Sequence, residues 1–162
     1  MWAILDSGAS SHFMVTDAPV IEKEKATAPL NIQLPDGASV TSSHTCLLDI
    51  PQLPRAVRIA HIVPGLHNRS LVSVVKLCNA GCEVRMNDIS CVVKCRGKPD
   101  IQCRKCTKTG LWMIPLTPEG NTPQHSDHNA HNMGKQEFVA TSVSRDFAAN
   151  IITIPIDFSN IV

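Results

Sequence analysis

The fold of this chain is decided by residues 2–12, Trp2-Ala3-Ile4-Leu5-Asp6-Ser7-Gly8-Ala9-Ser10-Ser11-His12. The aromatic and apolar character of residues 2–5 predicts a buried strand that ends in an acid, a hydroxyl and a glycine. We expect Gly8 to adopt a backbone conformation that a Cβ would forbid, and nearby backbone N–H groups to hold the Asp6 carboxylate. Two interpretations follow: a catalytic carboxylate, or an ordinary strand followed by an Asx or Ser turn.

Length, charge and cysteine content limit the class of protein. The 162 residues are enough for one domain with a core, and a formal net charge of +1 gives no general attraction to nucleic acid or to membranes. No apolar run approaches the roughly 20 residues that span a bilayer, and Asp6 interrupts the N-terminal apolar run too early for a signal peptide. Seven cysteines without a secretory signal therefore predict reduced thiols in an intracellular protein that is not secreted.

Alternating polarity predicts a series of short strands. Residues 13–28 are charged and are expected to form a surface loop, whereas 30–34 and 38–43 flank the turn Pro35-Asp36-Gly37 and predict a hairpin. In the expected strand 57–63, one apolar face would include His61 as a hydrogen-bonded core residue. Further strands are expected at 45–50, 82–86, 91–95, 101–106 and 111–116.

A single helix is expected at about residues 70–80. Apolar residues recur with helical spacing from Leu71 to Cys78, with Ser70 as the predicted N-cap and Gly81 at the C-terminal stop. Many short strands and one helix predict a mainly β fold, a small closed β-barrel over residues 1–116. The composition of 117–162 predicts a disordered low-complexity tail with a possible short strand at 151–156.

Several segments together resemble one known family. Ile4-Leu5-Asp6-Ser7-Gly8-Ala9-Ser10-Ser11-His12 is similar to the active-site segment of the retropepsin-like aspartic protease in Copia-type retrotransposon Pol polyproteins. The resemblance covers about residues 2–116 and implies a retropepsin-like barrel. Later segments that are similar to the family in order and spacing are Ala60-His61-Ile62-Val63-Pro64-Gly65-Leu66, Ser70-Leu71-Val72-Ser73-Val74-Val75-Lys76-Leu77, Ala80-Gly81-Cys82-Glu83-Val84 and Thr109-Gly110-Leu111-Trp112-Met113-Ile114-Pro115-Leu116.

The resemblance also implies roles for individual residues. Asp6 would be the catalytic acid, Ser7 would hydrogen-bond across a subunit interface, and Gly8 would keep the backbone close to the catalytic pair. Residues 35–37, Pro35, Asp36 and Gly37, would form the tip of a flap that closes over the substrate, although any surface hairpin of a β-barrel would look the same in sequence.

Aspartic protease chemistry requires two carboxylates that share a proton. This chain contains one Asp-Ser-Gly, so an active form would be a homodimer with Asp6 from each subunit at the twofold axis. The expected function is that of an aspartic endopeptidase domain that processes a Gag-Pol polyprotein in the cytoplasm, a virus-like particle or the nucleus. It would bind an extended peptide by strand addition and need no cofactor.

The alternative is a catalytically inactive retropepsin-like barrel, a structural or interaction module or a transposon remnant. Only five residues precede Asp6, whereas retroviral relatives carry an interface strand and a hairpin ahead of the catalytic turn. We therefore expect a truncated fragment.

Neither a metal site nor a nucleic-acid site is predicted. Cys91 and Cys95 would lie ~13 Å apart along one strand, too far for one zinc ion with Zn–S bonds of ~2.3 Å, and the C-x2-C pair Cys103 and Cys106 lacks a second pair. Basic residues cluster near the end of the expected barrel, but no aromatic residue is interleaved among them for base stacking. These basic residues are Lys94, Arg96, Lys98, Arg104, Lys105 and Lys108.

Overall fold

The computed structural model describes residues 1–34, 36–66, 69–117 and 138–140. Within them the chain is mainly β, as the sequence predicts. One α-helix, α1 (Val74–Asn79), follows β8, and a 3₁₀ helix, η1 (Arg55–Arg58), precedes β7. The strands are β1 (Trp2–Asp6), β2 (His12–Met14), β3 (Val20–Lys25), β4 (Asn31–Gln33), β5 (Ser39–Thr41), β6 (His44–Leu48), β7 (Ile59–Ile62), β8 (Leu71–Ser73), β9 (Glu83–Met86), β10 (Cys91–Lys94), β11 (Ile101–Lys105), β12 (Trp112–Pro115) and β13 (Phe138–Ala140).

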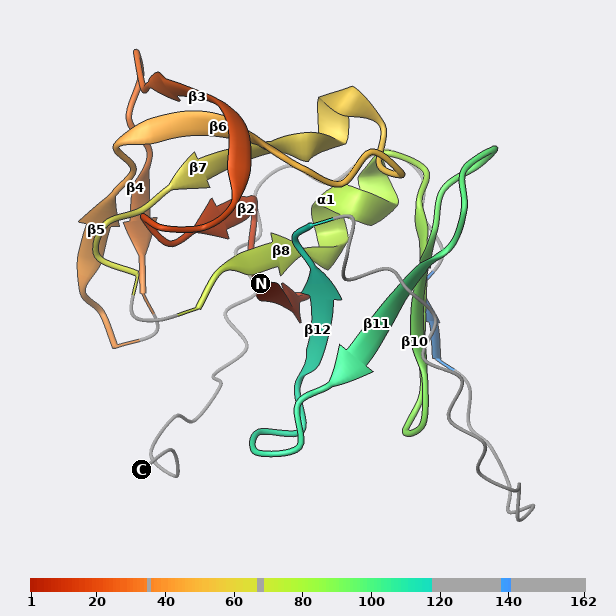
Figure 1. Cartoon of the computed structure of the whole chain (residues 1–162). Helices are drawn as coiled ribbons and strands as arrows, with labels where there is room; N and C mark the ends of the chain where they lie inside the picture. Colours follow the sequence, from red (N-terminus) through yellow and green to blue (C-terminus); the bar gives the residue numbers. More distant parts are fainter. Residues whose placement is uncertain (35, 67–68, 118–137, 141–162) are drawn as a thin grey trace.

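The predicted closed barrel is wrong, because the main sheet is open. Its 11 strands run in the linear order β13-β9-β10-β11-β12-β1-β8-β2-β7-β6-β3, and β4 and β5 form a separate hairpin. Figure 1 shows β3, β6 and β7 curving over one side of the molecule and β10, β11 and β12 on the other, with β8 and α1 between them. The end strand β3 carries exposed charges along its length, as expected of an edge that is not built for further pairing.

At the centre of the sheet, β8 lies between β1 and β2. It pairs in parallel with β1, with Asp6 opposite Ser73, and antiparallel with β2, with Phe13 opposite Leu71. The chain therefore leaves β1 at Asp6, passes the end of β8 and returns in β2. This arrangement brings the turn after Asp6 next to the junction between β8 and α1.

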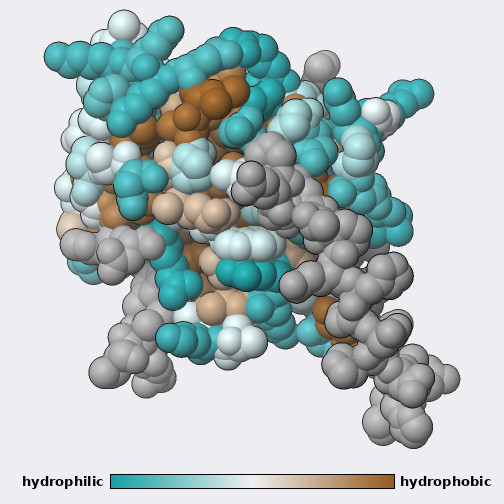
Figure 2. All heavy atoms as spheres, viewed as in Figure 1, coloured by the Kyte–Doolittle hydropathy of each residue, from teal (hydrophilic) through white to brown (hydrophobic). Residues whose placement is uncertain are grey.

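Two groups of buried side chains lie in the fold. The larger group joins β1, β6, β7, α1 and β9 to β12, and includes Leu5, Leu48, Ile62, Leu77 and Ile114. The smaller group consists of Ala9, Phe13 and Val63. On the face shown in Figure 2, hydrophobic residues are visible between hydrophilic ones in the part where Figure 1 shows β3 and β6.

The expected surface loop at 13–28 is wrong in part. Phe13 and Met14 are buried in β2, and 20–25 form the edge strand β3. The charge alternation at 22–25 correctly indicates a solvated stretch, but an edge strand is solvated too. Sequence alternation alone does not distinguish the two.

Two further expectations need correction. The helix is shorter than predicted, because 71–73 form β8 and the N-cap is Ser73 rather than Ser70. In β7 the core face carries Ala60 and Ile62 instead of the face that includes Ile59 and His61, and Ile59 is 44% exposed. The helix does end as expected, since Gly81 follows it with φ +81°. The hairpin at 30–43 and the strands from β9 to β12 are confirmed.

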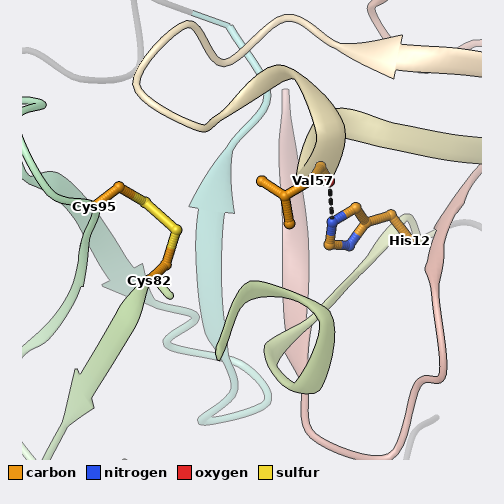
Figure 3. The surroundings of a disulfide bond; sticks show 4 residues. All are labelled: His12, Val57, Cys82 and Cys95. Carbon is orange, nitrogen blue, oxygen red and sulfur yellow. Dashed lines mark hydrogen bonds between the residues drawn. A yellow bond between two sulfur atoms is a disulfide. The ribbon is translucent and has the colours of Figure 1, made fainter. Parts of the chain in front are cut away.

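The sulfur chemistry also differs from the prediction of free thiols. Cys82, just after α1, and Cys95, just after β10, form a disulfide with a Cα–Cα distance of 4.5 Å (Figure 3). The five other cysteines are not part of a disulfide. A sequence count cannot reveal this pair, because the partners meet only when β9 and β10 align.

Beyond residue 117, the structure describes β13 (Phe138–Ala140). β13 pairs antiparallel with β9, with Val139 opposite Arg85. The predicted strand at 151–156 and the rest of the expected tail lie outside the described residues. Among the residues that are described, no helix has the length and apolar character needed to cross a membrane.

Candidate active site

Asp6 is the last residue of β1 and is partly exposed, while Ser7 and Gly8 are exposed. One carboxylate oxygen, Oδ1, accepts a hydrogen bond from the Gly8 backbone N–H at 2.8 Å. The expectation that a backbone N–H orients the carboxylate is therefore confirmed. The same bond defines an Asx turn, so both interpretations of the sequence predict it, and the surroundings of the turn must distinguish them.

At Gly8 the close approach of the Asp6 carboxylate limits side-chain size, whereas the backbone angle is ordinary. Gly8 is absent from the glycines with positive φ, so the expected special backbone conformation is wrong. A Cβ built at this position would lie 3.3 Å from Asp6 Oδ1. That is a tight contact, and a larger residue would have to displace the carboxylate or the turn.

Ser73 connects the turn to the helix. Its hydroxyl donates to the Ala9 carbonyl at 2.5 Å and accepts from the Lys76 backbone N–H at 3.1 Å. The residue is fully buried and lies opposite Asp6 in the β1–β8 register. One side chain therefore caps α1 and restrains the segment that follows the carboxylate. Sequence analysis missed Ser73, and its position in the family-like segment 70–77 was the only signal.

His12 closes the turn from the other end. Its Nδ1 accepts from the Ser73 backbone N–H at 2.9 Å, and its Nε2 lies 2.8 Å from the Val57 carbonyl, the contact drawn in Figure 3. Because an N–H donor faces Nδ1 and a carbonyl faces Nε2, the ring must be neutral with its proton on Nε2. Burial, with a smaller contribution from the charge of Lys76, lowers the pKa of His12 to about 4.

A second histidine lies one strand away. His61 on β7 pairs with Phe13 on β2, and the two ring centroids are 6.4 Å apart. The ring is half-buried, and its Nδ1 has no hydrogen-bond partner among the described residues. The predicted hydrogen-bonded core role is therefore not borne out at that nitrogen. Burial, followed by the charge of Lys76, lowers the pKa of His61.

The β4–β5 hairpin, the candidate flap, packs on the smaller hydrophobic cluster. Ala9 from the turn, with Phe13 and Val63, forms its buried part, and the hairpin residues Ile32 and Val40 pack against this cluster. The hairpin and the segment after Asp6 therefore share one apolar contact region. The sequence reveals the hairpin but not this contact, which joins segments some 20 to 30 residues apart.

The tip of the hairpin is exposed. Asp36 accepts from the Ala38 N–H at 2.9 Å, and Gly37 has φ +85°. Pro35 lies outside the described residues. These contacts are local to the turn, so the predicted substrate-binding role of the tip stays a prediction.

The structure places aromatic rings beside the basic strand β11. The Arg104 guanidinium carbon lies 4.0 Å from the ring centroid of Trp2, and Lys105 Nζ lies 5.6 Å from that of Trp112. In the sequence no aromatic residue is interleaved with this basic cluster. The two rings come from β1 and β12, and only the fold brings them beside β11. Both rings contact a cation of their own chain.

A metal site and a surface hollow were the other kinds of site considered among the described residues. Within the part of the chain that is described, no three His, Cys, Asp or Glu side chains gather in a way that could hold a metal ion. A surface hollow lined in part by Trp2, Val15, Asp17 and Ser70 does not include Asp6.

Comparisons with known proteins found no relative of this chain. No protein-family model, no curated protein and no solved structure matches this chain. Its function must therefore be argued from the site itself.

Proposed function

We propose that the chain is a retropepsin-like aspartic endopeptidase domain of a Copia-type retrotransposon Gag-Pol polyprotein, active inside the cell as a homodimer. The observation that carries the proposal is the anchored Asp6 turn. An accessible carboxylate ends a central strand and is oriented by the Gly8 N–H. The segment that follows is held by two buried side chains, Ser73 and His12.

The anchoring favours a catalytic turn over an ordinary one. A surface Asx turn needs only its own local hydrogen bond. Here the Ala9 carbonyl and the His12 ring are bound by Ser73, a residue more than 60 positions away in sequence. Such support holds a reactive group in a fixed orientation.

The chemistry requires a second chain. Two carboxylates that lie close together share one proton, because both cannot be ionised at short range. The ionised group would take a proton from water while the protonated group donates to the oxygen of the scissile carbonyl. Asp6 is the acid of the sole Asp-Ser-Gly in the sequence, and the exposure of Ser7 and Gly8 leaves this turn free to meet its copy from a second subunit.

The β4–β5 hairpin is the proposed flap. Its apolar side chains Ile32 and Val40 pack on the cluster that contains Ala9. Movement of the hairpin would therefore alter the packing of the segment that follows the Asp6 carboxylate. An extended peptide would bind beneath it through main-chain hydrogen bonds, with side-chain pockets giving specificity.

Peptide cleavage by the purified full chain tests the proposal. A library of peptides from a digested proteome is incubated at several protein concentrations from acidic to neutral pH, and new termini are identified by mass spectrometry. We expect the rate per chain to rise with concentration as dimers form, and Asp6→Asn to abolish cleavage. Asp88→Asn, at the exposed β9–β10 turn, is the matched control and should cleave like the wild type.

The alternative, an inactive module, makes the opposite predictions. The chain would remain monomeric at high concentration in light scattering, and any cleavage would be the same in wild type and Asp6→Asn. Either result would refute the dimeric protease.

A further inference from the structure

Two free cysteines face each other across β10 and β11. Cys91 is opposite Cys103 in the antiparallel register, so their side chains lie on the same face of the two strands, and the Cys103 thiol donates to the Ile101 carbonyl at 3.9 Å. Cys91 is 1% exposed, whereas Cys103 is partly exposed. The pair therefore combines a protected sulfur with one that solvent can reach.

The strand register brings the two cysteines to a separation that a disulfide can bridge. Directly opposed residues on antiparallel strands have Cα atoms about 4.5 or 5.5 Å apart, and disulfides span Cα separations of about 4.4–6.8 Å. The bonded pair Cys82 and Cys95, which bridges the ends of the neighbouring strands, has a separation of 4.5 Å. The strand register therefore places Cys91 and Cys103 within the range of Cα separations that a disulfide spans.

Cys46 and Cys106 differ from this pair in their surroundings. Cys46 is buried, and burial raises its pKa to about 11. Cys106 is partly exposed, and hydrogen bonds from Thr109 and from the Lys108 backbone lower its pKa to about 6. Cys106 is therefore expected to react fastest with external reagents, but it does not face Cys103, which precedes it by three positions on the extended chain.

We propose that Cys91 and Cys103 form a reversible disulfide site that is oxidised by low-molecular-weight disulfides of the glutathione type. The Cys103 thiol, the one of the pair that solvent reaches, loses its proton to solvent and attacks one sulfur of the disulfide, forming a mixed disulfide and releasing one thiol. This step is slow, because the neighbouring Cys91 and burial raise the pKa of Cys103. Cys91 then loses its proton, attacks the Cys103 sulfur and displaces the second thiol. The two cysteines lose two electrons in total, and the external disulfide becomes two thiols.

The bond would cross-link the half of the sheet that carries the other disulfide. Cys82–Cys95 ties the start of β9 to the end of β10, and Cys91–Cys103 would tie β10 to β11. Together they would join three consecutive strands covalently. The oxidised form should therefore resist urea better than the form in which this pair is reduced.

The test is a redox titration of the folded full chain in the Cys106→Ser background, which removes the most reactive exposed thiol. The protein is equilibrated with mixtures of reduced and oxidised glutathione, quenched by alkylation and mapped by mass spectrometry. We expect a Cys91–Cys103 cross-linked peptide to accumulate as the mixture becomes more oxidising, without retained glutathione, and to disappear with dithiothreitol. Cys46→Ser, which removes a buried cysteine outside the pair, should give the same titration.

Opposite results are equally clear. Complete alkylation of both cysteines in the most oxidising mixture would overturn the proposal, and so would a stable glutathione adduct on Cys103 or a cross-link to Cys82 or Cys95. Both cysteines of the pair are unaltered in this titration, so the result does not depend on the folding of a variant that lacks one of them. In Cys103→Ser, the oxidation-dependent gain in urea resistance should be lost.

Discussion

His12 should make the stability of the protein fall as the solution becomes acidic. The pKa of its ring is lowered from 6.5 to about 4, so the unfolded chain binds a proton at a pH where the folded chain does not. Stability is therefore complete above about pH 6.5 and is lost as the pH falls toward about 4. One pH unit corresponds to about 1.4 kcal/mol, so this group accounts for a loss of about 3 kcal/mol over the whole window.

The structural reason is the fixed pattern of donors around the ring. A proton added to Nδ1 would point at the Ser73 N–H, which now donates to that nitrogen at 2.9 Å. The neighbouring Lys76 adds repulsion, and burial penalises the charged ring. His61, whose pKa is lowered by burial and by Lys76, contributes in the same direction, so some pH dependence should remain after His12 is replaced.

Urea unfolding measured by circular dichroism between about pH 7 and about pH 4.5 tests this reasoning. His12→Gln keeps one donor and one acceptor but does not titrate, and it should reduce the slope of stability against pH. An imidazole titration of His12 by NMR with a midpoint near 6.5, or equal slopes in wild type and His12→Gln, would refute the reasoning.

Three further substitutions probe the turn and the hairpin. Ser73→Ala removes the helix cap and leaves the Ala9 carbonyl unpaired, so it should lower the free energy of urea unfolding by about 2–4 kcal/mol. Ser70→Ala loses one hydrogen bond from a backbone N–H and should lower it less. A larger loss for Ser70→Ala than for Ser73→Ala would contradict the assigned cap. Gly8→Ala places a Cβ 3.3 Å from the candidate carboxylate. It should lower the rate of peptide cleavage while leaving the free energy of unfolding nearly unchanged, and an unchanged cleavage rate would argue against that contact. Gly65→Ala places a Cβ 2.6 Å from a methyl group of the β5 valine and should loosen the β4–β5 hairpin, seen as faster limited proteolysis there; an unchanged cleavage pattern would count against this packing.

Local sequence patterns were sufficient for much of the fold. The apolar run into Asp6, the turn at 36–37 and the strands from 83 to 115 follow from periodicity and turn residues, which act over a few positions. The candidate carboxylate and its N–H partner could also be predicted, because Asp6 and Gly8 are two residues apart. The same local reasoning mistook β2 and β3 for a loop, since the buried three-residue strand β2 has no period of its own and the exposed charges of the edge strand β3 look like those of a loop.

What tertiary structure alone decided is how distant segments are paired. The register of β1 with β8 placed Ser73 beside the turn, the two bonds of His12 set its neutral form, and the alignment of β9 with β10 joined Cys82 to Cys95. The open sheet was decided in the same way, since closure requires its end strands to meet. Side-chain chemistry and short-range geometry are written in the sequence, but a contact between residues some 60 positions apart depends on which strands share hydrogen bonds, and that choice is made by the whole fold.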